Sequence, residues 1–321
     1  MTKLLNIAIV LLTAGLVAVI LVPQLQEGRP RVVRFACDST IASLPFFVAE
    51  DRGLFADNRI IPEIEFYSDP DLALAELLAG KADVGVFPWI TAIQHVSEHE
   101  ETLRVFMSQD FRATIPVDAI VVTKASRIGT IKDLQRQKLG YPPQLRGAIQ
   151  PFLLQADLPA ELVTTIELPL SQLTASLASG DIGAAWLIEP LVAMLDTSQF
   201  RVLEIGALPK FVSAPYPGAA VGFSPEFMNT GKVMLSRLKL SLDAAASFAD
   251  GKTDSARVIL ARYLGYDPEL LAACRMAEVQ RLVEINKPAI RTLASRLAVS
   301  GIITGDVDTD KMFVPPARMT R

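Results

Sequence analysis

The only two histidines of this chain are the first candidates for catalysis or metal binding, because imidazole titrates near neutral pH and ligates transition metals. His95 and His99 are spaced i, i+4 with Glu98 between them, which places both rings on one face of a helix. The order His-Val-Ser-Glu-His differs from the His-Glu-x-x-His pattern of zinc proteases, and a third histidine is missing. We therefore expect a solvated helix face, with no catalytic residue, no metal and no cofactor.

Other patterns typical of enzymes are also missing. Cys37 and Cys274 are too few for a disulfide framework or a four-thiolate zinc site, and we expect Cys37 to be a buried structural thiol. The sequence has no Gly-x-Ser-x-Gly, no P-loop and no Gly-x-Gly-x-x-Gly after a predicted strand. A net charge of −4 excludes nucleic-acid binding through bulk positive charge. Together these observations favour a binding protein over an enzyme.

Polar and aromatic side chains follow several of the predicted strands. In open α/β sheets, ligands bind beyond the carboxyl ends of the strands, where helix N-termini offer free N–H groups. We expect the ligand site to be built from the residues at such positions, which are Asp38, Ser39, Thr40, Ser43, Leu44, Phe87, Trp89, Tyr141, Arg146, Trp186 and Glu189.

Several of these residues have two readings. Trp89 and Trp186 occupy corresponding positions in two halves of the chain, and they either close on a ligand or fill the core. Arg146 either clamps an anion or is exposed to solvent, and Asp38 either binds a ligand amine or caps a turn. Arg146 favours a sulfonate, nitrate or carboxylate ligand, whereas Asp38 and Glu189 favour an aminated one. The sequence leaves the charge of the ligand open.

The elements that position these residues follow an α/β pattern. From residue 31 onward, short apolar runs such as 32–36 and 84–87 alternate with longer amphipathic stretches. After residue 225 the periodicity is helical, including a long helix predicted over 276–299. Residues 77–85 and 177–185 each read as a helix, a glycine stop, a turn and a strand. This echo predicts two lobes of similar topology.

The N-terminal segment has a different composition. Residues 4–23 carry no charge, and as a helix they would span roughly 30 Å, enough for a hydrocarbon core. A small-x-small cleavage pattern and a lipobox are both missing. The sequence therefore favours an uncleaved signal anchor over a cleaved signal peptide.

Four segments in order resemble the nitrate/sulfonate/taurine group of ABC-transporter substrate-binding proteins, which also takes in binding proteins for thiamine pyrimidine precursors. They are 43–55 (SLPFFVAEDRGLF), 75–85 (AELLAGKADVG), 130–141, which opens with TIKDL, and 180–190, which ends in Glu-Pro. Two features depart from the family pattern. Gly183 occupies a position where the family usually has Asp, and the loop 141–147 (YPPQLRG) is not rich in Gly, Ser or Thr.

The resemblance implies an α/β, two-lobed type II periplasmic-binding-protein fold with a hinge of two crossing strands, preceded by an N-terminal transmembrane helix. The crossings are expected at 117–123 and 219–223. The implied division is a signal anchor at 1–30, a discontinuous first lobe at 31–118 plus 222–321, and a second lobe at 119–221.

The function implied by the resemblance is that of an extracytoplasmic solute-binding protein, anchored to the inner membrane by residues 4–23. It would capture a small polar ligand of the sulfonate, nitrate, taurine or pyrimidine type and deliver it to ABC permease and ATPase subunits. The alternative is a membrane-anchored sensor or adaptor that uses the same fold without transport. An iron-dependent enzyme of thiamine biosynthesis is disfavoured, because the two cysteines are widely separated.

Overall fold

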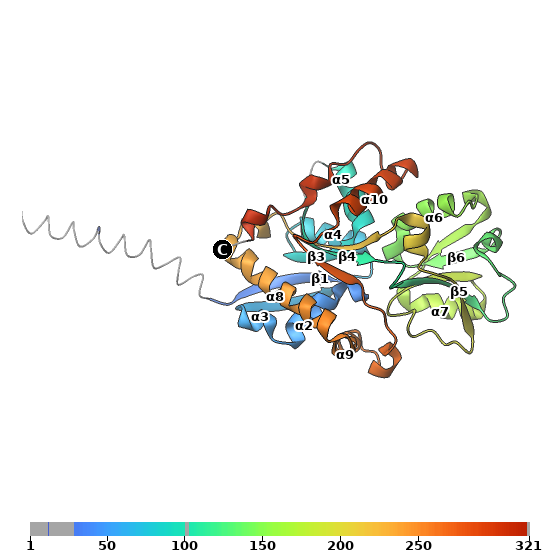
Figure 1. Cartoon of the computed structure of the whole chain (residues 1–321), viewed down its shortest axis with the longest axis horizontal. Coiled ribbons are helices and arrows are strands. Elements are labelled where there is room, and N and C mark those ends of the chain that lie inside the picture. Colours follow the sequence, from blue (N-terminus) through green and yellow to red (C-terminus); the bar gives the residue numbers. More distant parts are fainter. Residues whose placement is uncertain (1–11, 13–28, 100–102, 320–321) are drawn as a thin grey trace, which may run out of the picture.

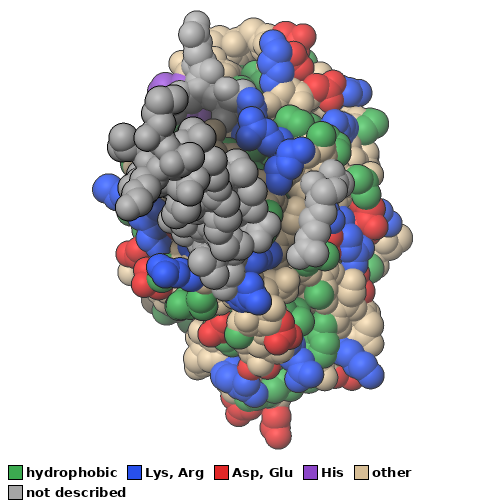
Figure 2. All heavy atoms as spheres, turned by 90° about the vertical axis from the view of Figure 1, so that its left-hand side faces the viewer, with side chains coloured by type: hydrophobic (Ala, Val, Ile, Leu, Met, Phe, Trp, Pro, Cys, Tyr) green, Lys and Arg blue, Asp and Glu red, His purple; other side chains and the backbone are tan. Residues whose placement is uncertain are grey.

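The computed structural model describes residues 12, 29–99 and 103–319 (Figure 1). The predicted membrane segment at 4–23 lies outside these residues, except for Leu12. Within the described part of the chain, no helix is both long and apolar enough to cross a membrane. Figure 2 views the end of the molecule at which the described chain begins, and its visible described surface mixes basic, acidic and apolar side chains.

The strands form two separate sheets that lie side by side along the long axis of the molecule (Figure 1). The first has the order β11-β4-β10-β3-β1-β2 and consists of β1 (Arg31–Cys37), β2 (Ile60–Phe66), β3 (Val84–Pro88), β4 (Arg104–Phe111), β10 (Tyr216–Phe223) and β11 (Glu278–Arg281). The second has the order β7-β6-β8-β5-β9 and consists of β5 (Asp118–Thr123), β6 (Lys138–Tyr141), β7 (Thr164–Glu167), β8 (Ala184–Ile188) and β9 (Phe200–Ile205).

Helices flank both sheets. Those beside the first sheet are α2 (Leu44–Asp51), α3 (Leu54–Asp57), α4 (Pro70–Leu78), α5 (Trp89–Glu98), α8 (Lys232–Gly251), α9 (Thr253–Leu264) and α10 (Lys287–Val299). Those beside the second sheet are α6 (Ile149–Gln155) and α7 (Leu170–Ser179), together with the short 3-10 helix η3 (Pro143–Ala148). One continuous cluster of buried apolar side chains includes residues of both sheets. The two halves of the molecule therefore pack through an apolar core.

The chain crosses between the sheets twice. It leaves the first sheet after β4, through residues 112–117, and returns after β9, through residues 206–215. Most of the predicted crossings, 117–123 and 219–223, instead lie inside β5 and β10, each of which pairs with a strand on both sides. The crossings were misplaced because β-branched residues in an extended backbone are equally typical of a connecting segment and of an interior strand.

The predicted helix at 276–299 is also corrected by the structure. Its first part, Glu278–Arg281, is β11 and pairs antiparallel with β4. The helix α10 begins at Lys287, where the Asn286 side chain accepts a hydrogen bond from the Ala289 backbone and Pro288 occupies the first turn. A capping side chain and an early proline are both typical of a helix start, so the helix cannot extend back to 276.

Candidate ligand site between the two sheets

A cavity of about 30 Å³ lies where the two sheets meet. Its wall is formed by Asp38, Thr40, Ala42, Phe87, Pro88, Phe111, Gln144, Leu145, Ile188, Leu208, Tyr216, Gly218 and Ala219. Such a volume has room for about two water molecules, so a larger ligand requires the two halves or the wall side chains to move. A larger hollow of about 820 Å³ beside β11 is more open to solvent and is lined by residues of the first half alone.

The first-sheet side of the wall is organised around Asp38, which directly follows β1. Its Oδ1 accepts hydrogen bonds from the Thr40 backbone N at 3.2 Å, the Thr40 Oγ1 at 2.9 Å and the Ser43 Oγ at 3.0 Å. The Asp38 backbone N donates in turn to the Ser43 Oγ at 2.9 Å. Burial raises the pKa of Asp38, while the hydrogen bonds from Thr40 and Ser43 act in the opposite direction. Asp38 therefore holds the turn and also faces the cavity.

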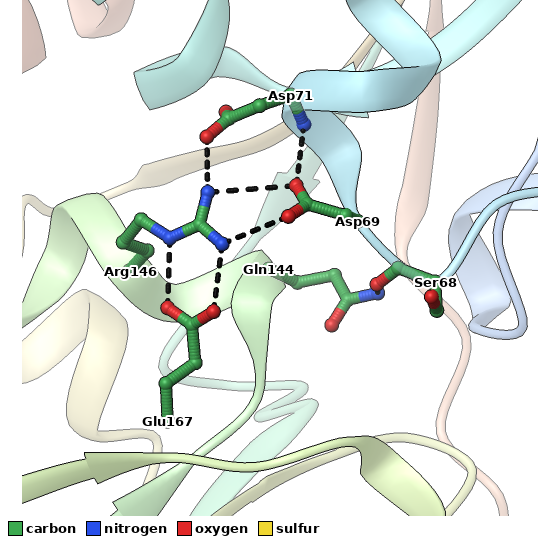
Figure 3. A network of polar contacts seen from close by, with 6 residues as sticks. All are labelled: Ser68, Asp69, Asp71, Gln144, Arg146 and Glu167. Atoms are coloured by element: carbon green, nitrogen blue, oxygen red, sulfur yellow. Dashed lines mark hydrogen bonds and ion pairs between the residues drawn. The ribbon is translucent and has the colours of Figure 1, made fainter.

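The second-sheet side of the wall is organised around Gln144, in η3. Its Nε2 donates to the Ser68 carbonyl oxygen at 3.4 Å, a contact that joins the two halves (Figure 3). Its Oε1 is buried and has no hydrogen-bond partner among the described residues. Gln144 thus presents a free acceptor at the cavity.

Tyr216 and Leu208, from the returning chain, complete this part of the wall. The Leu208 backbone N donates to Asp118 Oδ2 at 3.0 Å, just behind the wall. Burial, and to a smaller extent the charge of Asp118, raise the pKa of Tyr216. The Tyr216 hydroxyl therefore stays protonated at neutral pH.

Both tryptophans lie behind the cavity and are absent from its wall. Each is fully buried. The Trp89 indole Nε1 donates to Ser108 Oγ at 2.8 Å, and the Trp186 indole Nε1 donates to Asp118 Oδ2 at 2.8 Å. Their positions match the core-filling reading, and the indole N–H groups orient polar side chains on neighbouring strands.

Arg146 lies on η3 two residues beyond Gln144 (Figure 3). It is not among the residues that line the cavity. Its Nε and Nη2 donate to the two carboxylate oxygens of Glu167, both at 2.7 Å. Its Nη2 also donates to Asp69 at 3.0 Å, and its Nη1 donates to Asp71. The hydrogen bonds to Glu167 are the main cause that raises the pKa of Arg146. These four residues form the Arg146 cluster, in which the protein's own carboxylates occupy the donors that an anion clamp would need.

The structure brings three of the predicted site residues together on the cavity wall, namely Asp38, Thr40 and Phe87. Ser39 is exposed and Tyr141 is half-buried, while Ser43, Leu44 and Glu189 are buried away from the wall. Phe111 and Tyr216 line the cavity but were not among the predicted site residues. Gln144 belongs to the loop that was already singled out, whereas Phe111 and Tyr216 follow no motif in the sequence.

His95 lies on α5 and His99 directly follows this helix, and their rings stack at 4.4 Å between centroids. The part of the chain that the structure describes contains no group of three or more His, Cys, Asp or Glu residues placed to hold a metal ion. Cys37 is fully buried, and burial is the main cause that raises the pKa of its thiol.

Three comparisons place the chain among known proteins. No curated protein matches the sequence. The sulphonate-binding protein SsuA of Escherichia coli superposes with a TM-score of 0.70 at 15% identity, covering 88% of this chain and 97% of its own. SsuA of Xanthomonas axonopodis pv. citri, bound to MOPS, gives 0.72 at 16% identity, covering 89% and 99%. The nitrate-binding protein NrtA of Synechocystis PCC 6803 gives 0.65 at 11% identity, covering 91% of each chain.

At these identities the likeness establishes the fold, which is that of periplasmic binding proteins. The family model described as NMT1/THI5 like matches residues 40–208, more than half of the sequence. This chain therefore belongs to the NMT1/THI5-like family.

Proposed function

We propose that this chain is an extracytoplasmic solute-binding protein that encloses a small polar ligand between its two halves and delivers it to an ABC permease. The observation that carries the proposal is the cavity between the sheets, whose wall takes Asp38 from one half and Gln144 from the other. A site shared by two bodies joined by two chain crossings suits a protein that closes on its ligand by hinge motion.

The solved structures of this fold support the same class of function. Three proteins of similar structure are a sulphonate-binding, an alkanesulfonate-binding and a nitrate-binding protein.

The proposal extends to the organisation of the chain. The sequence-based division, 31–118 with 222–321 and 119–221, shifts by a few residues, because β10 (Tyr216–Phe223) belongs to the first sheet. One lobe therefore lies before the crossing at 112–117 and after the crossing at 206–215, and the other lies between them. Residues 4–23 anchor the protein in the inner membrane with both lobes outside the cytoplasm. The partners are then the permease and ATPase subunits of an importer. Co-purification of a permease with the full-length chain supports this assignment, whereas co-purification of a kinase or cyclase favours the sensor.

Thermal unfolding tests the binding function directly. A ligand that binds only the folded chain raises Tm by an amount that grows with ligand concentration. The full-length chain, purified in mild detergent, is heated with members of a panel of alkanesulfonates, taurine, nitrate, carboxylates, amines and pyrimidines. We expect one class to raise Tm by several degrees in a saturable manner. If no member shifts Tm while circular dichroism shows a folded protein, the proposed function is wrong.

A further inference from the structure

The described residues that line the cavity include no cationic side chain. Apart from Tyr216, its only ionisable residue is Asp38. The nearest arginine along η3, Arg146, is bound to three carboxylates outside the wall. An anion entering the cavity would therefore meet a carboxylate and no compensating positive charge.

The polar groups at and behind the wall have an excess of acceptors. Among the described residues, the buried oxygens Gln144 Oε1, Gln109 Oε1 and Asp118 Oδ1 have no hydrogen-bond partner. Gln144 is itself part of the wall. Gln109 donates to the carbonyl of Ala42, and Asp118 accepts from the backbone N of Leu208; both of these partners line the cavity.

The side-chain donors of Thr40 and Gln144 are used within the protein, while the Tyr216 hydroxyl, which can both donate and accept, is also on the wall. Thr40 donates its hydroxyl hydrogen to Asp38, and Gln144 donates from Nε2 to Ser68. Among the described residues, Asp38 Oδ2 accepts a hydrogen bond only from the Thr40 hydroxyl. The single hydrogen of this hydroxyl is shared between Oδ1 and Oδ2 of Asp38. A carboxylate has about four acceptor positions, so Oδ2 keeps the capacity to bind a further donor.

From this arrangement we propose that the group recognised in the cavity is a small cation that donates hydrogen bonds, such as a protonated amine or an amidinium. Asp38 Oδ2 neutralises it and Gln144 Oε1 accepts its second hydrogen bond. This inference rests on the proposed function and specifies the charge of its ligand.

The physical reason is desolvation. A buried anion without a cationic partner loses its hydration and gains repulsion from Asp38, and both effects oppose binding. An ammonium head loses its hydration too, but it gains a carboxylate and satisfies acceptors that otherwise stay unpaired. The size of the cavity agrees, because methylammonium has only two heavy atoms whereas a sulfonate head has four.

The test compares cationic and anionic probes of similar size on the full-length chain in mild detergent at pH 7.5. The cationic arm is methylamine, ethylamine and acetamidine as chlorides, and the anionic arm is nitrate and methanesulfonate as sodium salts, with sodium chloride as the baseline. We expect a saturable rise in Tm with at least one cation and none with the anions.

Three variants connect the effect to the cavity. Asp38→Asn keeps the shape of the side chain and removes its charge, and it should weaken cation binding at least tenfold. Gln144→Leu removes the free acceptor at similar volume, and it should also weaken binding. Asp110→Asn is the matched control, because Asp110 is a buried carboxyl that accepts from Gln280 and is not on the wall. It should bind cations within twofold of the unmodified chain.

The outcomes separate this inference from the proposed function. A Tm shift with anions alone overturns the inference and leaves the solute-binding function standing. A cation shift that survives both Asp38→Asn and Gln144→Leu overturns the assignment to this cavity. If Asp38→Asn does not fold, the Tm shift of Gln144→Leu with the cations decides whether they bind in this cavity. A folded chain that responds to neither arm, nor to the wider panel, overturns both proposals.

Discussion

Among the polar contacts between the halves that the structure describes, those of Glu189 and of the Arg146 cluster differ chiefly in their exposure to water. Glu189, at the end of β8, has a fully buried side chain that accepts hydrogen bonds from the backbone N of Ala193 at 2.9 Å and of Arg275 at 3.2 Å. Arg275 precedes β11, so this contact links the second sheet to the first. In the Arg146 cluster, the arginine side chain is 38% exposed and faces carboxylates of both halves.

This difference in exposure indicates which of the two contacts contributes more to the free energy that holds the halves together. Water and dissolved salt weaken the Coulomb attraction within an exposed cluster, and ordering long side chains costs entropy. A buried carboxylate has lost its hydration, so each remaining hydrogen bond matters more and its protonation state affects stability. We expect the Glu189 contact to respond to pH and the Arg146 cluster to respond mainly to salt.

The largest expected effect comes from Glu189→Gln. Burial raises the pKa of Glu189 to about 7 from an ordinary value of 4.5. Because the folded state holds this proton more tightly than the unfolded state, the stability it contributes is fully present below about pH 4.5 and is lost as the pH rises through about 7. At about 1.4 kcal/mol per pKa unit, the loss is about 3 kcal/mol. The Tm of the unmodified chain should therefore fall between pH 5 and 8, and Glu189→Gln should flatten this fall.

A control variant, Asp110→Asn, measures how much of the pH dependence of Tm comes from another buried carboxyl. Burial also raises the pKa values of Asp110 and Asp118 to about 6, so part of the pH dependence will survive in the variant. Asp110→Asn should remove a smaller part, at lower pH. If Glu189→Gln and the unmodified chain show the same dependence of Tm on pH, the buried contact does not titrate as we infer.

The second prediction concerns Gly147→Ala, which tests how closely the two halves approach each other. Gly147, on η3, packs against Ile90 on α5, and a Cβ at this glycine would lie 2.0 Å from Ile90 Cγ2. Gly147→Ala therefore forces the halves apart at this point. Overpacking of this kind costs about 1–3 kcal/mol. We expect a lower free energy of unfolding in urea and at least tenfold weaker ligand binding.

The partner substitution makes this prediction specific. Ile90→Ala removes Cγ2, the atom that the new Cβ would meet at 2.0 Å, and leaves Gln94 Oε1 and Ile90 Cβ at 3.0 and 3.2 Å. The double variant should therefore recover part of the loss, with a coupling energy measurable in a double-mutant cycle. Gly251→Ala is the matched control, because Gly251 lies in α8 and its Cβ would meet none of the described residues packed around the helix within 4 Å. If both alanine variants have the same effect, close approach at Gly147 is not the cause.

The repeated helix–glycine–turn–strand pattern at 77–85 and 177–185 shows what the sequence can predict. Gly80 and Gly180, which follow α4 and α7, both adopt the left-handed conformation, with φ of 71° and 82°, and each precedes a strand of the expected sheet. This requirement is local, so the residue type reveals it. The alternation of apolar runs likewise predicts the α/β class and most of the strands, because burial of one strand depends on its own side chains.

The walls of the cavity depend on contacts that no local pattern reports. Tyr216 lies opposite Phe111 because β10 and β4 pair antiparallel, although the two are far apart in sequence. An arginine at position 146 suits an anion clamp. Its carboxylate partners Asp69 and Glu167 lie 77 and 21 residues away in the sequence, so no local pattern shows that they occupy its donors. Because charge pairing is set by tertiary structure, the sequence alone leaves the charge of the ligand open.

The smallest expected effect comes from Arg146→Ala. The variant breaks a contact to Glu167 within the second half and contacts to Asp69 and Asp71 across the halves, where Glu189 forms an ion pair with Arg275 alone among the described residues. Exposed ion pairs nevertheless contribute about 0–1 kcal/mol each and are screened by salt. Urea unfolding should show a loss of about 1 kcal/mol at low salt, and it should shrink further in 1 M sodium chloride.

Lys132→Ala provides the comparison within one half, because Lys132 pairs with the exposed Asp157 without joining the two sheets. Its loss should be no larger than that of Arg146→Ala and equally sensitive to salt. A loss at Arg146 that exceeds the effect of Glu189→Gln and persists in 1 M salt would reverse the comparison. The number of ion pairs across the halves, rather than their burial, would then determine how strongly the halves hold together.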